Sequence, residues 1–233
     1  MTNDGSTTIH LPEWNESYHS KHGAIQEAYH VFIKNGFLLF EGHELLQTGE
    51  AKPISILEIG FGTGLNAFIT FVESLKSNQV INYVGVEAYP VSIEEAMQMN
   101  YISQMAENQS DIFKSLHHLA WEEEHQLTAH FSFTKRQQFF QDITDTNTFD
   151  LIYFDAFGFR VQPELWSDLI FQKMYDALRP NGILVTYACR TSIKNAMLLA
   201  GFSVEKLPGA PGKREMLRAT KGLSKFNIFV DNI

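Results

Sequence analysis

A glycine-rich loop after a short apolar run constrains this chain more than any other feature of its sequence. Residues 54–59 form a mostly apolar run of strand length, and they lead directly into Gly60, Gly62 and Gly64. Residues 65–72 then have the apolar spacing of a helix. Glycines at such a strand-to-helix turn let the backbone approach a ligand closely and leave the N–H groups of the helix start available. This order is typical of α/β folds that bind ligands beside the loop.

Further apolar runs extend the pattern beyond the loop. They cover residues 83–87, 149–155 and 182–187, and each is continuously apolar rather than alternating. Such runs indicate strands buried on both faces of a parallel sheet. Helices are expected between the strands, near residues 91–107, 111–124, 136–144, 163–178 and 191–200. We predict a Rossmann-like, doubly wound α/β fold, with a mostly parallel sheet and helices on both faces.

The first 50 residues do not join this alternation. Residues 17–32 have helical spacing, and residues 31–40 are predicted to form two short strands around an Asn-Gly turn. We predict that residues 1–50 form an N-terminal cap and that residues 51–233 form the Rossmann-like domain. No apolar run approaches the ~20 residues needed to span a bilayer. The acidic N-terminus lacks Lys and Arg before residue 21, so no leader sequence is predicted.

Cysteine and histidine usage limits the chemistry. The single Cys189 excludes an internal disulfide and a thiolate cluster, which predicts a reducing compartment, the cytoplasm. The nine histidines include no HxH or HxxxH pair, so no metal site is predicted.

Charge is distributed unevenly along the chain. The net charge of −9 alone argues against a nucleic-acid partner, because neutralisation of phosphates supplies most nonspecific affinity. Residues 1–155 hold 7 Lys and Arg against 21 Asp and Glu, whereas residues 156–233 hold 11 against 6. The turn-rich segment 206–225 is the most basic. This basic third is compatible with a polyanionic substrate, and chance segregation of charge explains it equally well.

The glycine spacing discriminates between cofactors. The dinucleotide fingerprint requires its third glycine one place later, where this chain has Leu65, so a nicotinamide or flavin is disfavoured. Glu58 before the compact glycine loop resembles instead the first motif of S-adenosylmethionine-dependent methyltransferases. A glycine turn that serves packing alone is the alternative.

Polar side chains follow the later strands at the sheet edge where ligands bind. Glu87 comes 23 residues after Gly64, and a carboxylate there can accept both hydroxyls of a cofactor ribose. Asp155 ends the fourth strand, where a carboxylate can orient an amine and take its proton. Gln137 and Gln138, after the third strand, are candidates for an adenine contact. A surface Glu and a turn or helix-capping Asp are the structural alternatives.

Several separated motifs follow one another over nearly the whole chain. They are Leu57–Asn66, Asp155–Phe157 with Pro163–Trp166, Ala200–Phe202, and Pro208–Gly209 with Gly212–Leu217. In sequence and order they resemble the methyltransferase part of the MnmC family, a bacterial family that modifies the wobble uridine of transfer RNA.

The resemblance implies methyl transfer from S-adenosylmethionine to the amine of 5-aminomethyl-2-thiouridine in transfer RNA. Asp155 is then the catalytic residue, and Arg160, Lys213, Arg214 and Arg218 are predicted to contact phosphates. The residues predicted to bind the cofactor are Glu58, Gly60, Phe61, Gly62, Thr63, Gly64, Asn66, Glu87, Gln137, Asp155 and Phe157.

Larger family members carry a flavin oxidase domain that prepares the amine. The chain shows no second glycine fingerprint and resembles the standalone form, so a separate oxidase or another amine-generating pathway is the implied functional link. Two departures matter: residues 158–162 replace the usual Ala-Pro-x-x-Asn, and no Asp follows the third strand. Two alternatives stay open: a small-molecule methyltransferase or aminopropyltransferase of the same fold, and a nonenzymatic RNA-binding module with a degenerate pocket.

Overall fold

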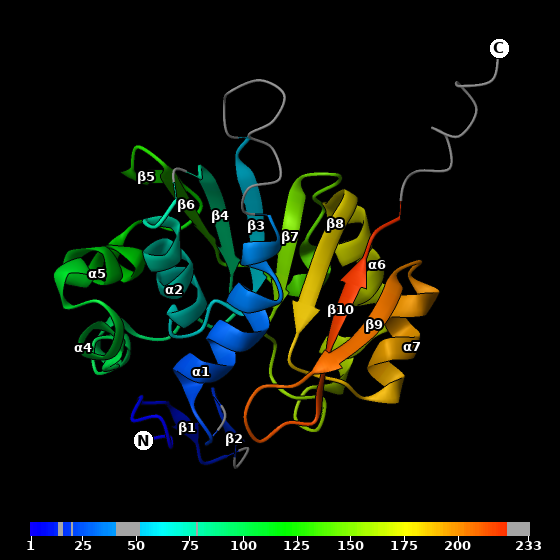
Figure 1. Cartoon of the computed structure of the whole chain (residues 1–233), viewed down its shortest axis with the longest axis horizontal. Helices are drawn as coiled ribbons and strands as arrows, with labels where there is room; N and C mark the ends of the chain where they lie inside the picture. Colours follow the sequence, from blue (N-terminus) through cyan, green and yellow to red (C-terminus); the bar gives the residue numbers. More distant parts are fainter. Residues whose placement is uncertain (14–15, 20, 41–51, 78, 223–233) are drawn as a thin grey trace.

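An eight-stranded sheet forms the centre of the molecule (Figure 1). The computed structural model describes residues 1–13, 16–19, 21–40, 52–77 and 79–222. The strand order is β5-β6-β4-β3-β7-β8-β10-β9. Five neighbouring strands run parallel: β6 (Phe131–Arg136), β4 (Ile81–Val86), β3 (Ile54–Ile59), β7 (Phe149–Phe154) and β8 (Leu178–Thr186). Antiparallel pairing adds β5 (Glu124–Thr128) at one edge and β10 (Glu215–Thr220) and β9 (Ser203–Pro208) at the other.

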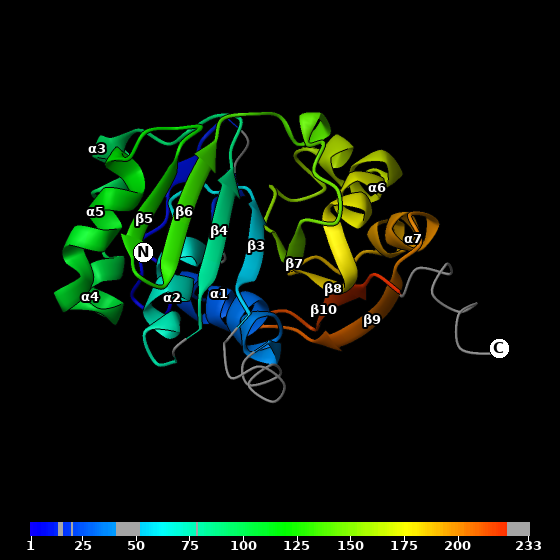
Figure 2. The same ribbon diagram turned by 90° about the horizontal axis from the view of Figure 1, so that it is seen from above.

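Helices cover both faces of this sheet (Figures 1 and 2). One face carries α1 (Ala24–Ala28), α2 (Leu65–Ser74), α4 (Tyr101–Met105) and α5 (Ser110–His118), with the short α3 (Ile93–Ala96) beside α5. The other carries α6 (Asp168–Ala177) and α7 (Thr191–Leu199). Successive β3 residues point to opposite faces, so Ile56 belongs to one hydrophobic core and Leu57 to the other. The predicted Rossmann-like α/β fold is therefore confirmed.

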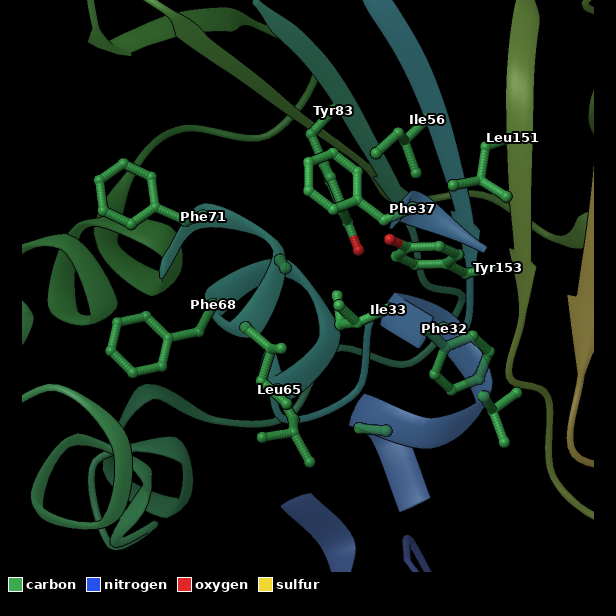
Figure 3. Close-up of a cluster of buried hydrophobic side chains, with 14 of the residues drawn as sticks. Phe32, Ile33, Phe37, Ile56, Leu65, Phe68, Phe71, Tyr83, Leu151 and Tyr153 are labelled. Atoms are coloured by element: carbon green, nitrogen blue, oxygen red, sulfur yellow. The ribbon is translucent and has the colours of Figure 1, made fainter. Parts of the chain in front are cut away.

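The N-terminal segment packs into the first of these cores. A small hairpin of β1 (His10–Leu11) and β2 (Glu16–Ser17) precedes α1, which continues into the π-helical turn η1 (Tyr29–Lys34) and the 3-10 turn η2 (Phe37–Leu39). Figure 3 shows Phe32, Ile33 and Phe37 lying against side chains from the sheet and α2. The division at residue 50 stays a prediction, because residues 41–51 lie outside the described part of the chain.

The predicted hairpin over residues 31–40 is wrong. Val31, Phe32 and Ile33 are all buried in one core. Successive side chains of a strand point to opposite faces, so an edge strand would expose at least one of these three. A helical turn can bury all of them. The Asn35 side chain donates a hydrogen bond to the His30 carbonyl (2.7 Å), so it closes the helical turn instead of opening a hairpin.

Other element boundaries also differ from the prediction. The expected helix 111–124 ends at His118, and 136–144 contains only the 3-10 turn η4 (Phe140–Asp142). The expected helix 163–178 is divided into η5 (Pro163–Trp166) and α6, because Ser167 between them is extended. The remaining 3-10 turn, η3 (Glu107–Gln109), precedes α5. The basic segment 206–225, predicted as turns, contains all of β10 and the end of β9. The mostly exposed edge strand β9 lacks the apolar pattern that marks buried strands.

No helix within the described residues is long and apolar enough to cross a membrane.

The packing of the N-terminal segment can be tested at Phe32. Its ring lies 5.1 Å from that of Tyr153 on β7 and is 2% exposed. Phe32→Ala should lower the free energy of unfolding by about 3–5 kcal/mol, because it leaves a cavity in the core. Denaturant unfolding should still show one transition. Tyr29→Ala, at an exposed position of the same helical segment, should change stability by less than about 0.5 kcal/mol. A second transition would mean that the segment folds separately from the sheet.

Candidate active site

A pocket of about 640 Å³ lies at the carboxyl ends of the parallel strands. Its walls include the glycine loop after β3, residues 87–89 after β4, residues 139–141 after β6, residues 155–158 after β7, and Tyr187 after β8. The N-terminal segment, Gln162, Glu164, Leu165 and Lys213 complete it. Its volume is in the range of sites that enclose a small molecule or cofactor.

Gly60 brings two strand ends into close contact. Its φ of +88° favours glycine, and an added Cβ would lie 2.6 Å from the Asp155 carbonyl oxygen. The N–H groups of Gly60 and Phe61 both donate to the Val86 carbonyl (3.0 Å each), which fixes the loop against β4. The absence of a side chain at residue 60 therefore lets the loop and the Asp155 backbone form one continuous wall.

Glu87 is tied to the glycine loop. Its carboxylate accepts hydrogen bonds from the backbone N–H groups of Gly62 and Tyr89, both at 3.0 Å. Burial raises the pKa of Glu87, while these backbone donors act in the opposite direction. Each carboxylate oxygen keeps a second lone pair, so the group can also accept from a ligand hydroxyl.

Asn66 connects two acidic side chains. Its Nδ2 donates to Glu58 Oε1 (3.0 Å) and to Asp155 Oδ2 (2.8 Å), while Tyr83 donates to Glu58 Oε2 (2.9 Å). Both amide hydrogens of Asn66 are therefore engaged. Its Oδ1 is buried and has no hydrogen-bond partner among the described residues, although Asn66 lines the pocket. A ligand with an N–H or O–H donor, such as the ammonium group of S-adenosylmethionine, would fit this acceptor.

The same arrangement controls protonation. Burial raises the pKa of Asp155 to about 7, an effect that Glu27 strengthens and that the hydrogen bond from Asn66 and the charge of Lys213 oppose. Burial also raises the pKa of Glu58 well above its ordinary value. Asp155 thus exchanges a proton near neutral pH, as a general base must.

The N-terminal segment contributes residues that sequence analysis missed. The Tyr18 ring meets Phe157 edge to face, with centroids 4.9 Å apart, and an added Cβ at Gly62 would lie 3.2 Å from it. Glu16 forms an ion pair with Arg160 (2.9 Å). These contacts join segments far apart in the sequence, and no local motif marks them.

Nine of the predicted site residues line the pocket. They are Gly60, Phe61, Gly62, Thr63, Asn66, Glu87, Asp155, Phe157 and Lys213. Glu58 lies behind the wall, and Gly64 is the N-cap of α2. Gln137 does not line the pocket; its backbone N–H donates to Glu122, and Phe139, Phe140 and Gln141 line the wall instead.

The predicted phosphate contacts do not form one free basic face. Arg160 pairs with Glu16, and Arg218 pairs with Glu205 (2.6 Å). Lys213 pairs with Glu27 inside the pocket. Arg160 and Arg214 are both exposed, but only Arg160 of these two forms an ion pair recorded among the described residues. Within the described residues, no three His, Cys, Asp or Glu side chains gather as a metal site would require.

Fold and site together define a Rossmann-like cofactor-binding protein of the methyltransferase type. Residues 96–222 match a family described as S-adenosyl-L-methionine-dependent methyltransferase, a match that covers more than half of the chain. The chain belongs to this family, and S-adenosylmethionine is its cofactor.

Curated relatives align with most of this chain. The tRNA 5-methylaminomethyl-2-thiouridine biosynthesis bifunctional protein MnmC of Leptospira borgpetersenii is 27% identical over 216 residues, which cover 88% of this chain and 32% of that protein. The protein of the same name from Delftia acidovorans is 28% identical over 229 residues, covering 91% and 33%. The chain therefore spans about a third of the length of these relatives.

Solved structures share the fold. The crystal structure of MNMC2 from Aquifex aeolicus superposes with a TM-score of 0.73 at 21% identity, covering 97% of this chain and 72% of that one. Spermidine synthase from Thermotoga maritima gives 0.51 at 14% identity, covering 94% and 70%.

Gly60 provides a test of the loop. Gly60→Ala should weaken S-adenosylmethionine binding at least about tenfold, because the methyl group must displace the Asp155 backbone and the positive φ becomes strained. Gly222→Ala is the matched control and should keep the wild-type affinity, since Gly222 lies outside the pocket and an added Cβ there meets no described atom within 4 Å. Calorimetry measures both. Equal affinity in folded Gly60→Ala protein would show that the loop does not shape the cofactor site.

Glu87 provides a second test. Glu87→Ala should weaken S-adenosylmethionine binding by about 1.5–3 kcal/mol, the range for hydrogen bonds to a charged group. Glu94→Ala removes an exposed carboxylate of α3 and should leave the affinity unchanged. Titration of both variants, after circular dichroism has confirmed their fold, measures the effect. Wild-type affinity in Glu87→Ala would remove this side chain from the cofactor site.

Proposed function

We propose that this chain methylates the amine of 5-aminomethyl-2-thiouridine at the wobble position of transfer RNA. The observation that carries the proposal is Asp155, a half-buried carboxyl group with a pKa of about 7 that lines the pocket beside the glycine loop. The names of the curated relatives supply the substrate, and the match covers most of this chain.

The chemistry requires a neutral amine. An alkylamine resembles lysine, whose reference pKa is about 10.4, so it arrives mostly protonated at neutral pH. In the proposed step the amine gives a proton to Asp155, directly or through water, and its lone pair forms the new N–C bond. The methyl–sulfur bond breaks, and its electron pair stays on sulfur. S-adenosylmethionine, when bound, supplies the activated methyl group.

The remaining roles follow from the pocket. Asn66 Oδ1 and the glycine loop would hold the methionine end of the cofactor, and Glu87 would accept the ribose hydroxyls. Phe139 and Phe140 replace Gln137 as candidates for contact with the adenine. Alignment of amine and methyl group can supply about 7–11 kcal/mol of the barrier in favourable cases.

Phosphate contacts need a revised proposal. Arg214 is exposed and suited to them, whereas Arg160 and Arg218 would exchange a carboxylate partner for a phosphate. A separate flavin oxidase or another amine-generating reaction would supply the substrate. The cytoplasm, where transfer RNA is modified, is the proposed compartment.

The function is tested with purified protein, S-adenosylmethionine and transfer RNA that carries the 5-aminomethyl-2-thiouridine. Mass analysis of the digested nucleosides should show a gain of one methyl group on this nucleoside. Transfer RNA with an unmodified wobble uridine is the control and should gain none. Methylation of free small amines but not of the RNA would support the small-molecule alternative, and absence of cofactor binding would support the nonenzymatic one.

Asp155→Asn separates catalysis from cofactor binding. Turnover should fall by about 10²-fold or more, because an amide fills the space but cannot take the proton, while cofactor affinity changes little. A full single-turnover rate at neutral pH would show that the amine loses its proton elsewhere.

The same variant predicts a pH dependence of stability. Because the folded pKa of Asp155 lies above its unfolded value, the stabilising contribution of the protonated group is complete below about pH 4 and lost as pH rises through about 7. Asp155→Asn should therefore match the wild type near pH 4 and exceed it by roughly 2–4 kcal/mol at pH 8. Denaturant unfolding across this range checks the sign.

A further inference from the structure

Lys213 is held inside the pocket by two partners. It lies in the turn between β9 and β10, and its Nζ forms an ion pair with Glu27 of α1. The same Nζ lies 3.9 Å from the centre of the Tyr187 ring, a cation–π geometry. The Tyr187 hydroxyl in turn donates to the Ala156 carbonyl (2.8 Å), which fixes the ring. The lysine head group therefore has a defined position.

The turn that carries Lys213 is itself anchored. A ring nitrogen of His30 lies 2.8 Å from the Pro208 carbonyl oxygen. An added Cβ at Gly212 would lie within 2.5 Å of the His22 ring, so turn and N-terminal segment are in close contact. An ammonium group held in one position can discriminate between ligands by the atoms that they place beside it, whereas a mobile surface lysine cannot.

The ammonium group still has a donor to offer. A lysine ammonium group has three N–H donors and cannot accept a hydrogen bond. Glu27 pairs with the ammonium by charge and the Tyr187 ring engages it through its face, so a hydrogen of Lys213 stays available to a ligand acceptor. Lys213 and Asp155 line the same pocket, and their charges interact. A ligand whose amine lies at Asp155 would thus present its neighbouring atoms to Lys213.

The atoms beside such an amine differ between uridine and cytidine. A substituent at C5 lies beside C4, which carries a carbonyl oxygen in uridine and an amino group in cytidine. The carbonyl oxygen accepts a hydrogen bond from an ammonium group, whereas the amino group presents only donors to it. We propose that Lys213 is a specificity-determining residue that donates to the C4 carbonyl oxygen of the target base and rejects an amino group there.

This proposal rests on the proposed function, since it takes the amine to be a C5 substituent of a pyrimidine. It changes the predicted role of Lys213 from a phosphate contact to a contact with the base. The pairing with Glu27 supports this change, because a carboxylate beside the lysine would repel a phosphate but tolerates a neutral carbonyl group.

The test compares two RNA hairpins of identical sequence, one with 5-aminomethyluridine and one with 5-aminomethylcytidine at the target position. The readout is the ratio of kcat/KM for the two. Wild-type protein should prefer the uridine hairpin by about 10- to 100-fold or more. Lys213→Met should lose most of this preference, and Lys213→Gln should also relax it, because an amide can offer either a donor or an acceptor.

Glu27→Gln should reduce the ratio as well, since it weakens the ion pair that orients the ammonium. Lys206→Met, which removes an exposed lysine of β9 paired with Glu215, should leave the ratio unchanged. Thermal unfolding and cofactor titration establish that each variant is folded.

The two hypotheses fail in different ways. If wild-type protein methylates neither hairpin nor modified transfer RNA, the proposed function is wrong, and this inference is wrong with it. If the wild type is active but shows no preference, or if Lys213→Met lowers both rates equally and keeps the ratio, then the function stands. In that case Lys213 serves only to connect the turn with α1, and its role in specificity is excluded.

Discussion

The amide of Asn66 is the contact on which the active-site end of this structure depends. Glu58 is fully buried and Asp155 is half-buried at the pocket, and burial makes each carboxyl group costly to keep without hydrogen bonds. One amide group donates to both of them. The carbonyl oxygen of Asn66 has no partner among the described residues. In the proposed function, cofactor binding and proton transfer would therefore both depend on this one side chain.

The N-terminal segment is as much a part of the site as the sheet is. It packs Phe32 into the core and places Tyr18 and Glu27 at the pocket. The Rossmann-like strands offer a ligand surface along one edge, and a segment that crosses this edge can enclose it. Enclosure lowers the local dielectric constant and strengthens each electrostatic contact inside. The raised pKa of Asp155 is a consequence of this enclosure.

Pairing of charges changes how the basic third of the chain is interpreted. Arg160, Lys213 and Arg218 each contact a carboxylate, two of them on segments distant in sequence. A count of charges along the sequence does not reveal such pairs, because they form only when the segments meet. The excess of basic residues therefore serves partly to join the N-terminal segment to the rest of the molecule, and the Lys213 side chain lines the pocket.

The sequence by itself determined the buried strands β3, β4 and β7, the apolar part of β8, the glycine loop and the positions of Glu87 and Asp155. These features depend on local signals: continuous apolar runs, glycines at a turn, and an acid at a strand end. It did not determine the order of the strands in the sheet, the helical form of residues 31–40, the antiparallel strands β9 and β10, or the walls made by Tyr18, Glu27 and Phe139. Tertiary structure decided those, because burial against distant elements overrides local preference, and because ion pairs between distant segments leave no periodic pattern in the sequence.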